Sequence, residues 1–339
     1  MRVAITGALS YTGRYLAKDA LGLGIEVVNL SRRLLPIAVD PLTTDEVGEL
    51  TRSRVAPAFK DAKLLAAQLE GCDVLFCTYW TRFAGASQHD VAVANCGALF
   101  DAAKAAGVQK IVFSSHTRAK IGSPYPYIDG KARANERLRS CGVNYAIVRP
   151  CGIFGDAPSE SVLLNNAAWV VRRVPVFLVP GDGSHRFQPI HVRDMARLML
   201  DLGLSVDTSG EERDACGPEA PTTLDLFTKL RDALGAFAAI VPVGNLVSTK
   251  AITALTRPIN LITGDILLDA DDLDLLCAGL TTADDPSDPA IPHRRSLFSW
   301  IDEHSHHLGT RYVSSIERYY YTGPLADPPP PSSSSAANV

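Results

Sequence analysis

Residues 1–33 read MRVAITGALSYTGRYLAKDALGLGIEVVNLSRR, and this stretch decides the fold. Arg2–Thr6 is short, apolar and rich in strand-forming residues, so we predict a buried parallel strand there. Apolar residues at helical spacing predict a helix over Tyr11–Leu23 that ends at Gly24. Ile25–Leu30 is predicted to be the second strand. A strand, a glycine-rich turn, a helix and a strand in this order form the βαβ unit that binds dinucleotides.

The turn between the first strand and the helix has the spacing G-x-x-S-x-x-G. A helix N-terminus has unpaired N–H groups and a partial positive charge, so it can hold a pyrophosphate. Glycines let the backbone approach the phosphates and let the helix pack on the strand. Ser10 stands where a middle glycine is expected, so either its Cβ crowds the pyrophosphate or its hydroxyl bonds a phosphate oxygen. We predict that the cofactor contacts Gly7, Ser10, Tyr11, Thr12 and Gly13.

The end of the second strand distinguishes between two cofactors. An acidic residue there would bind the ribose 2′-hydroxyl of NAD, whereas an arginine accommodates the 2′-phosphate of NADP. The sequence has Ser31, Arg32 and Arg33 at this point and no acid. Guanidinium groups match the geometry of a phosphate, so we predict NADP as the cofactor, with NAD as the second possibility. The alternative is a solvated basic loop without a ligand.

Composition excludes several classes of protein. The 339 residues are 46% hydrophobic and 21% charged, as in an ordinary globular protein, and the net charge of −4 gives no reason to expect binding to nucleic acid. The seven cysteines are scattered without metal-ligand spacing, so we expect free thiols in a reducing compartment and no metal site. The first strand begins at residue 2 and the apolar stretch 236–255 is interrupted by polar residues, so we predict a cytoplasmic protein without a membrane span.

Strands and helices alternate through the first half of the chain, which predicts an α/β fold with a doubly wound parallel sheet of Rossmann type. With a third strand beside VAPAFKD at 55–61, the fourth, fifth and sixth strands are expected over Cys72–Thr78, Lys110–Ser115 and Asn144–Arg149. Further helices are expected over Ala62–Leu69, Ala86–Ala106 and Pro126–Ser140. Residues 37–54 are polar and irregular and are assigned to an insertion or a short helix. The carboxyl ends of the strands in such a sheet face the ligand crevice. We therefore expect Thr78–Trp80 to lie along the ribose and nicotinamide side of the cofactor. An equal alternative is that the two aromatic side chains of this segment pack inside the protein.

Tyr127 and Lys131 form the predicted chemical centre. They stand four residues apart on a predicted helix, so they share one face. A lysine ammonium beside a phenol favours the phenolate and lowers the pKa of the tyrosine. Such a tyrosine can exchange the proton of a carbinol while hydride passes to or from a nicotinamide. The spacing is common by chance on a solvated helix face, but its position after the fifth strand of the same sheet favours the chemical interpretation.

This combination resembles the short-chain dehydrogenase/reductase superfamily, in its extended and atypical branches: sugar-nucleotide epimerases, NmrA-like proteins and proteins like the 39-kDa subunit of respiratory complex I. The resemblance covers residues 1–235 and rests on TGALSYTG at 6–13, SRR at 31–33, Asn95, KIVFSS at 110–115, YIDGK at 127–131, VRPCGIFG at 148–155 and RFQPIHVRDMA at 186–196. It implies backbone contacts from Pro150 to Ile153 with the nicotinamide end. It also implies a helix that opens beneath the substrate lobe with His191, Val192, Asp194 and Ala196.

The third catalytic position that the resemblance implies is a serine or threonine. Counting from the fifth strand places His116 there, flanked by Ser115 and Thr117, and we take Ser115 as the catalytic hydroxyl with its two neighbours as alternatives. On the lobe helix, Asn165 and Asn166 either bond substrate or cap neighbouring backbone.

The resemblance also implies a smaller C-terminal substrate lobe. We expect an NAD(P)-binding Rossmann domain over 1–156, to which 186–205 returns, and a substrate lobe over most of 157–323. The proline- and serine-rich residues 324–339 are predicted to be a disordered tail.

The sequence therefore predicts an NADP(H)-dependent oxidoreductase or epimerase that acts on a small carbonyl or hydroxyl compound. Tyr127 would be its acid and base, and Lys131 would lower the pKa of Tyr127 and hold the ribose. The alternative is a non-catalytic NADP-binding redox sensor or an assembly or accessory protein, as some atypical members of the superfamily are. The sequence predicts neither the substrate nor the oligomeric state.

Overall fold

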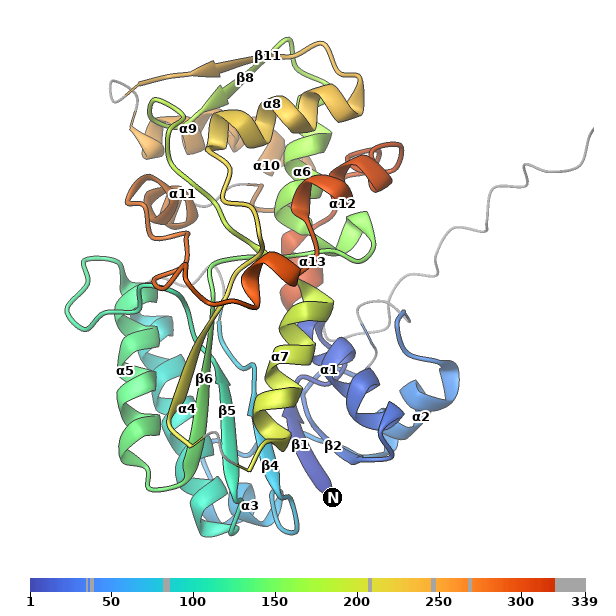
Figure 1. Cartoon of the computed structure of the whole chain (residues 1–339), viewed down its shortest axis with the longest axis vertical. Helices are drawn as coiled ribbons and strands as arrows, with labels where there is room; N and C mark the ends of the chain where they lie inside the picture. Colours follow the sequence, from blue (N-terminus) through green and yellow to red (C-terminus); the bar gives the residue numbers. More distant parts are fainter. Residues whose placement is uncertain are drawn as a thin grey trace, which may run out of the picture.

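A parallel sheet at the centre of the molecule positions the candidate site. The computed structural model describes residues 1–34, 36, 40–81, 86–206, 209–244, 248–267 and 270–320. Seven parallel strands run in the order β10-β6-β5-β4-β1-β2-β3 (Figure 1). Their bounds are β1 Arg2–Thr6, β2 Glu26–Leu30, β3 Arg54–Val55, β4 Val74–Cys77, β5 Lys110–Ser114, β6 Asn144–Pro150 and β10 Glu211–Ala215. The order reverses between β1 and β4, which confirms the predicted doubly wound sheet and sets the ligand crevice at the carboxyl ends of these strands.

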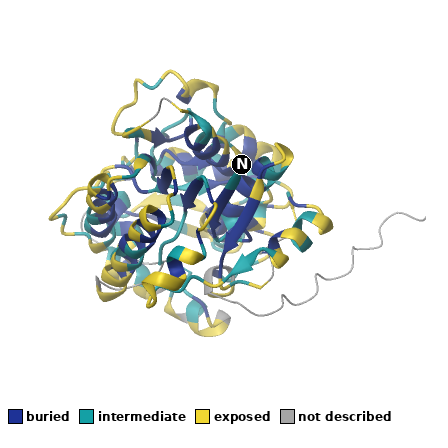
Figure 2. Cartoon of the chain, turned by 90° about the horizontal axis from the view of Figure 1, so that it is seen from below, coloured by how far each residue is buried: buried dark blue, intermediate teal, exposed yellow. Residues whose placement is uncertain are grey.

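Helices cover both faces of this sheet. On one face lie α1 (Tyr11–Gly22), α2 (Thr44–Arg52) and α7 (Val192–Leu204), and on the other lie α3 (Ala62–Ala67), α4 (Ala86–Ala105) and α5 (Pro126–Ser140). Figure 2 shows buried strands between helices whose outer faces are exposed. Because water reaches neither face of the central strands, their sequences are continuous apolar runs rather than alternating ones.

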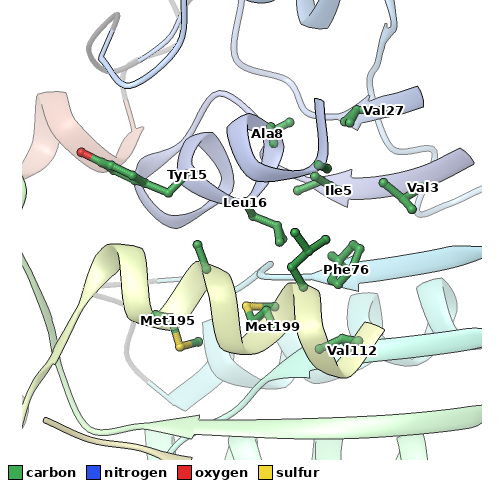
Figure 3. Packing of buried hydrophobic residues seen from close by; sticks show 14 of the residues in the cluster. Val3, Ile5, Ala8, Tyr15, Leu16, Val27, Phe76, Val112, Met195 and Met199 are labelled. Carbon is green, nitrogen blue, oxygen red and sulfur yellow. The ribbon is translucent and has the colours of Figure 1, made fainter. Parts of the chain in front are cut away.

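Helix α7 returns from far along the chain to pack against α1. Leu16 of α1 and Met199 of α7 lie in one buried cluster with Phe76 of β4 (Figure 3). Gly203 permits the close approach of α7 to the sheet, because a Cβ at this position would lie 2.4 Å from the Phe76 Cζ atom. The helix begins after His191, its N-cap, which confirms the helix that the resemblance implied there.

A smaller lobe stands above the carboxyl ends of the strands (Figure 1). It has two parallel pairs, β8 (Val176–Val179) with β11 (Ala239–Pro242) and β7 (Ile153–Phe154) with β9 (Ile190–His191). Its helices are η1 Pro158–Glu160, α6 Val162–Val171, α8 Thr223–Leu234, α9 Thr249–Leu255, α10 Arg257–Thr263, α11 Ala270–Cys277, η2 Ile291–His293, α12 Leu297–His304 and α13 Ser315–Tyr320. Its apolar core includes Phe154 and Trp300, whose rings meet edge to face at 5.5 Å between centroids.

The sequence missed the seventh strand of the main sheet. Strand β10, with the sequence EERDA, carries four charged residues and has no apolar pattern. Among the described strands it pairs only with β6, at the edge of the sheet, where Glu211, Glu212 and Arg213 are partly or fully exposed to water while Asp214 is buried. The polar stretch 37–54 contains α2, so the short helix proposed for it is present. The predicted tail, residues 324–339, lies outside the described residues, and no helix within the described ranges combines the length and apolarity needed to cross a bilayer.

Candidate active site

The glycine-rich turn leaves the N-terminus of α1 open. Gly7 has φ of +69°, in the left-handed region, and both the amide and the hydroxyl of Ser10 donate to its carbonyl oxygen, at 2.8 and 2.6 Å. Ser10 thus closes the turn, and its side chain makes no capping bond to the helix. Position 13 must be glycine because the helix backbone there lies against the carbonyl of Gly7. A Cβ at this position would lie 1.9 Å from the Gly7 oxygen. The first N–H groups of α1 remain without a side-chain cap, as an anion site needs.

The first two residues of α1 lie at the mouth of this turn, half-buried. The Tyr11 hydroxyl donates to the carbonyl oxygen of Gly155, at the entry to the smaller lobe. Tyr11 therefore joins the glycine-rich turn to the segment that leads into the lobe, and Thr12 is half-buried beside it. Cofactor contact through these two residues remains a prediction.

Three arginines surround the carboxyl end of β2. Ser31 is buried and its hydroxyl accepts from the Arg33 amide at 3.0 Å, so the hydroxyl shapes the turn. Arg32 is exposed and Arg33 is half-buried, with burial and the charge of Arg14 lowering the pKa of Arg33. Arg54, which sequence reasoning missed, donates to the Ser31 carbonyl oxygen at 3.3 Å. The position of Arg54 at the start of β3, which pairs with the end of β2, could have indicated that it lies near Ser31.

An aromatic wall stands at the end of β4. Phe59 and Tyr79 have ring centroids 5.0 Å apart, and Asn95 donates to the Tyr79 hydroxyl at 2.8 Å. Burial raises the pKa of Tyr79, and the nearby charge of Arg32 acts against this rise. Tyr79 therefore lies close enough to Arg32 for this charge to act on its phenol. Thr78, predicted to face the ribose, donates its hydroxyl to the Thr6 carbonyl at 2.6 Å and ties the ends of β4 and β1 together.

Tyr127 and Lys131 lie on one face of α5, as the spacing predicts. The Lys131 ammonium is 5.9 Å from the centre of the Tyr127 ring and donates to the Ser114 carbonyl at 2.7 Å. Its side chain is only 3% exposed, and burial lowers the pKa of Lys131 to about 8. The aromatic faces of Trp80 and Phe113 also enclose the ammonium, at 4.1 and 5.0 Å. The helix therefore presents a half-buried phenol and a buried cation on one face.

The three candidates for the third catalytic position have different surroundings. His116 meets Tyr127 edge to face, with ring centroids 5.3 Å apart, and its Nδ1 bonds the Thr117 carbonyl. Burial lowers the pKa of His116 to about 4, so the imidazole is neutral near pH 7. The Ser115 hydroxyl is buried without a hydrogen-bond partner among the described residues. Thr117 donates to Leu280 of the lobe at 3.3 Å. The structure therefore brings His116 into ring contact with Tyr127, and a catalytic role for Ser115 remains a prediction.

The segment from Pro150 to Ile153 is held on both sides by backbone bonds. The Pro150 carbonyl accepts from the Thr117 amide at 3.1 Å, and Gly152 accepts from Ile190 at 2.9 Å. Ile153 begins β7 and pairs with Ile190. These bonds fix the segment at the ends of β5 and β6, below the smaller lobe.

Asn165 and Asn166 are structural. Their side chains bond the backbone of residues 309–313 through Gly309, Arg311 and Val313, at 2.8–3.1 Å. The capping interpretation of the two asparagines is therefore confirmed.

Within the described ranges, no cluster of histidine, cysteine and acidic side chains could hold a metal ion.

Comparisons with known proteins agree with this geometry. A sequence model of an NAD(P)H-binding family matches residues 7–170. The chain is 26% identical over 289 residues to mitochondrial NADH dehydrogenase [ubiquinone] 1 alpha subcomplex subunit 9 of Dictyostelium discoideum, covering 83% of this chain and 78% of that protein. It is 26% identical over 249 residues to an uncharacterized protein of Mycobacterium tuberculosis, covering 72% of this chain but only 24% of the mycobacterial protein.

Solved structures show the same fold. An NADPH-dependent quinone oxidoreductase of Escherichia coli, complexed with NADPH, superposes with a TM-score of 0.66 at 19% identity, covering 89% of this chain and 99% of that one. A nucleoside-diphosphate-sugar epimerase of Staphylococcus aureus gives a TM-score of 0.66 at 17% identity, covering 89% and 100%.

Proposed function

We propose that the chain belongs to the atypical branch of the short-chain dehydrogenase/reductase superfamily and is an NADP(H)-dependent oxidoreductase or epimerase acting on a small carbonyl or hydroxyl compound. The observation that carries the proposal is the placement of Tyr127 and Lys131 on one helix face at the crevice. The bound nicotinamide would supply or accept the hydride. Tyr127 would hold the proton of the substrate hydroxyl, and the ammonium of Lys131 would stabilise the phenolate.

The residues around the first strand fit a dinucleotide. The open N-terminus of α1 offers N–H groups to a pyrophosphate, and Gly13 leaves room for its approach. Arg32, Arg33 and Arg54 supply guanidinium groups where a ribose 2′-phosphate would lie. The preference for NADP over NAD is therefore part of the proposal.

Calorimetry with NADPH and NADH tests the cofactor preference. NADPH is expected to bind more tightly by about 1–3 kcal/mol, the scale of hydrogen bonds to charged groups. Arg32→Ala should remove most of this difference, whereas Arg52→Ala, at an exposed arginine of α2, should keep it. Equal or tighter binding of NADH by the wild-type protein would refute the preference.

A second candidate function is that of a non-catalytic NADP-binding accessory or assembly protein. Two observations favour it: His116 stands where a serine or threonine is expected, and a relative over most of the chain is named as a subunit of NADH dehydrogenase. A screen of quinones, aldehydes and ketones with NADPH separates the candidates. NADPH binding without oxidation by any of these compounds would favour the second candidate. Location in the cytoplasm remains a prediction.

A further inference from the structure

The indole of Trp80 covers the ammonium of Lys131. The lysine nitrogen lies 4.1 Å from the centre of the indole ring, closer than to the rings of Phe113 and Tyr127, at 5.0 and 5.9 Å. Trp80 itself packs on α5, where a Cβ at Gly130 would come within 3.2 Å of the ring. The glycine at position 130 therefore lets the indole lie close against the helix, because a Cβ there would be in tight contact with the ring.

This cover occupies donors that a ribose would use. An ammonium has three N–H donors, and one of those on Lys131 goes to the Ser114 carbonyl. Aromatic faces surround the rest of the group, and the side chain is 3% exposed. Lys131 therefore cannot bond a ribose hydroxyl in this conformation, although holding the ribose is part of the role that the sequence predicts for it.

The covered state contains one unfavourable feature. The indole N–H of Trp80 is buried and has no hydrogen-bond partner among the described residues. An N–H that loses water and gains no acceptor opposes burial. The attraction between the ammonium and the indole face acts in the other direction. The two effects oppose each other, so a ligand that offers oxygens to Lys131 can shift the balance toward an uncovered state.

We propose that Trp80 is a positioning residue, which covers Lys131 in the cofactor-free protein and is displaced when the nicotinamide ribose of NADP(H) binds. The inference rests on the proposed function, since it is the ribose that replaces the indole. Trp80 is the third residue after the end of β4, on the edge that faces the crevice, and this position puts the indole beside the predicted path of the cofactor.

Amine labelling of the cofactor-free protein tests the cover. The protein is pulsed with an acetylating reagent, and modification of Lys131 is read by peptide mass spectrometry. Lys131 is expected to stay unmodified in the wild type and to be modified in Trp80→Ala. Trp169→Ala is the matched control, because that indole also lies over a cation, Arg173 at 4.6 Å, but on α6 of the lobe. Fast labelling in the wild type, or continued protection in Trp80→Ala, would overturn the inference.

Cofactor affinity tests the displacement. Removing the indole abolishes one cation–π contact that NADPH must replace, so Trp80→Ala is expected to bind NADPH roughly 2–30-fold more tightly. Trp80→Phe keeps an aromatic ring against Gly130 and replaces the alanine variant if that variant does not fold. It should give a smaller gain in NADPH affinity. Weaker NADPH binding in both variants would show that Trp80 is a wall of the cofactor site and would overturn the inference.

The two proposals fail in different ways. Wild-type binding of NADPH without a gain in the Trp80 variants would overturn the displacement and leave the proposed function standing. A wild type that binds no NADPH would overturn the proposed function, and the displacement with it.

Discussion

Replacement of Glu160 by glutamine is expected to destabilise the protein by about 3–5 kcal/mol, the cost of leaving a buried charge without its partner. Arg14 of α1 and Glu160 of η1 form an ion pair whose side chains are 0% and 1% exposed. Tyr15 donates to the same carboxylate at 2.6 Å, and Arg14 also donates to the Asp40 carbonyl at 2.9 Å. Glutamine keeps the size of the side chain but removes its charge. The Asp40 carbonyl cannot compensate, because it is neutral.

Urea unfolding followed by circular dichroism measures this cost. Two comparisons make the result specific. Glu303→Gln, at an exposed glutamate of α12, should change the free energy of unfolding by less than about 0.5 kcal/mol. The double variant Arg14→Met with Glu160→Leu replaces the pair by apolar side chains and should recover most of the lost stability. A cost below about 1 kcal/mol for Glu160→Gln would place the pair in the range of solvated ion pairs and refute the reasoning.

Three further predictions concern Tyr127, a helix cap and a buried lysine. Tyr127→Phe keeps the ring and should lower turnover by about 10²–10⁴-fold at unchanged NADPH affinity; turnover at the wild-type rate would make the Tyr127–Lys131 spacing a coincidence. Burial lowers the pKa of His191 from 6.5 to about 4. Between pH 6.5 and pH 4 the unfolded chain therefore binds more protons than the folded protein does. The free energy of unfolding is expected to fall by about 3 kcal/mol as the pH drops through this range. His191→Asn keeps the helix cap and should reduce that loss, measured by urea unfolding at about pH 7 and about pH 4.5, while His306→Asn, at an exposed site, should not. Lys110 donates to the carbonyls of Leu202 and Ser205 at 2.9 and 2.6 Å. Lys110→Met should therefore lower the free energy of unfolding by about 1–3 kcal/mol, measured in a thermal or urea melt. An unchanged free energy of unfolding would show that water replaces the ammonium.

Local chemistry was enough to predict the first βαβ unit and the helix that contains Tyr127 and Lys131. The turn needs Gly7 for its positive φ and Gly13 for the close approach of the helix backbone to the Gly7 carbonyl. The two glycines are only six residues apart in the sequence. Helix α5 has the predicted bounds Pro126–Ser140, because a proline favours the first helical position and the residues that follow support the helix. Such features depend on neighbours in the chain, so a single sequence contains them.

Contacts between distant segments were decided by packing. Nothing in the local pattern around Trp80 indicates that its indole lies over Lys131, because that contact depends on how the end of β4 meets α5. Arg54 reaches Ser31 only because two short strands pair in parallel, and Arg14 meets Glu160 across 146 residues of chain. Hydrophobic periodicity identifies which face of an element is buried, but not which partner fills the space beside it. The tertiary structure therefore decided the surroundings of Tyr127 and Lys131, while their place on one helix face was predictable from their spacing in the sequence.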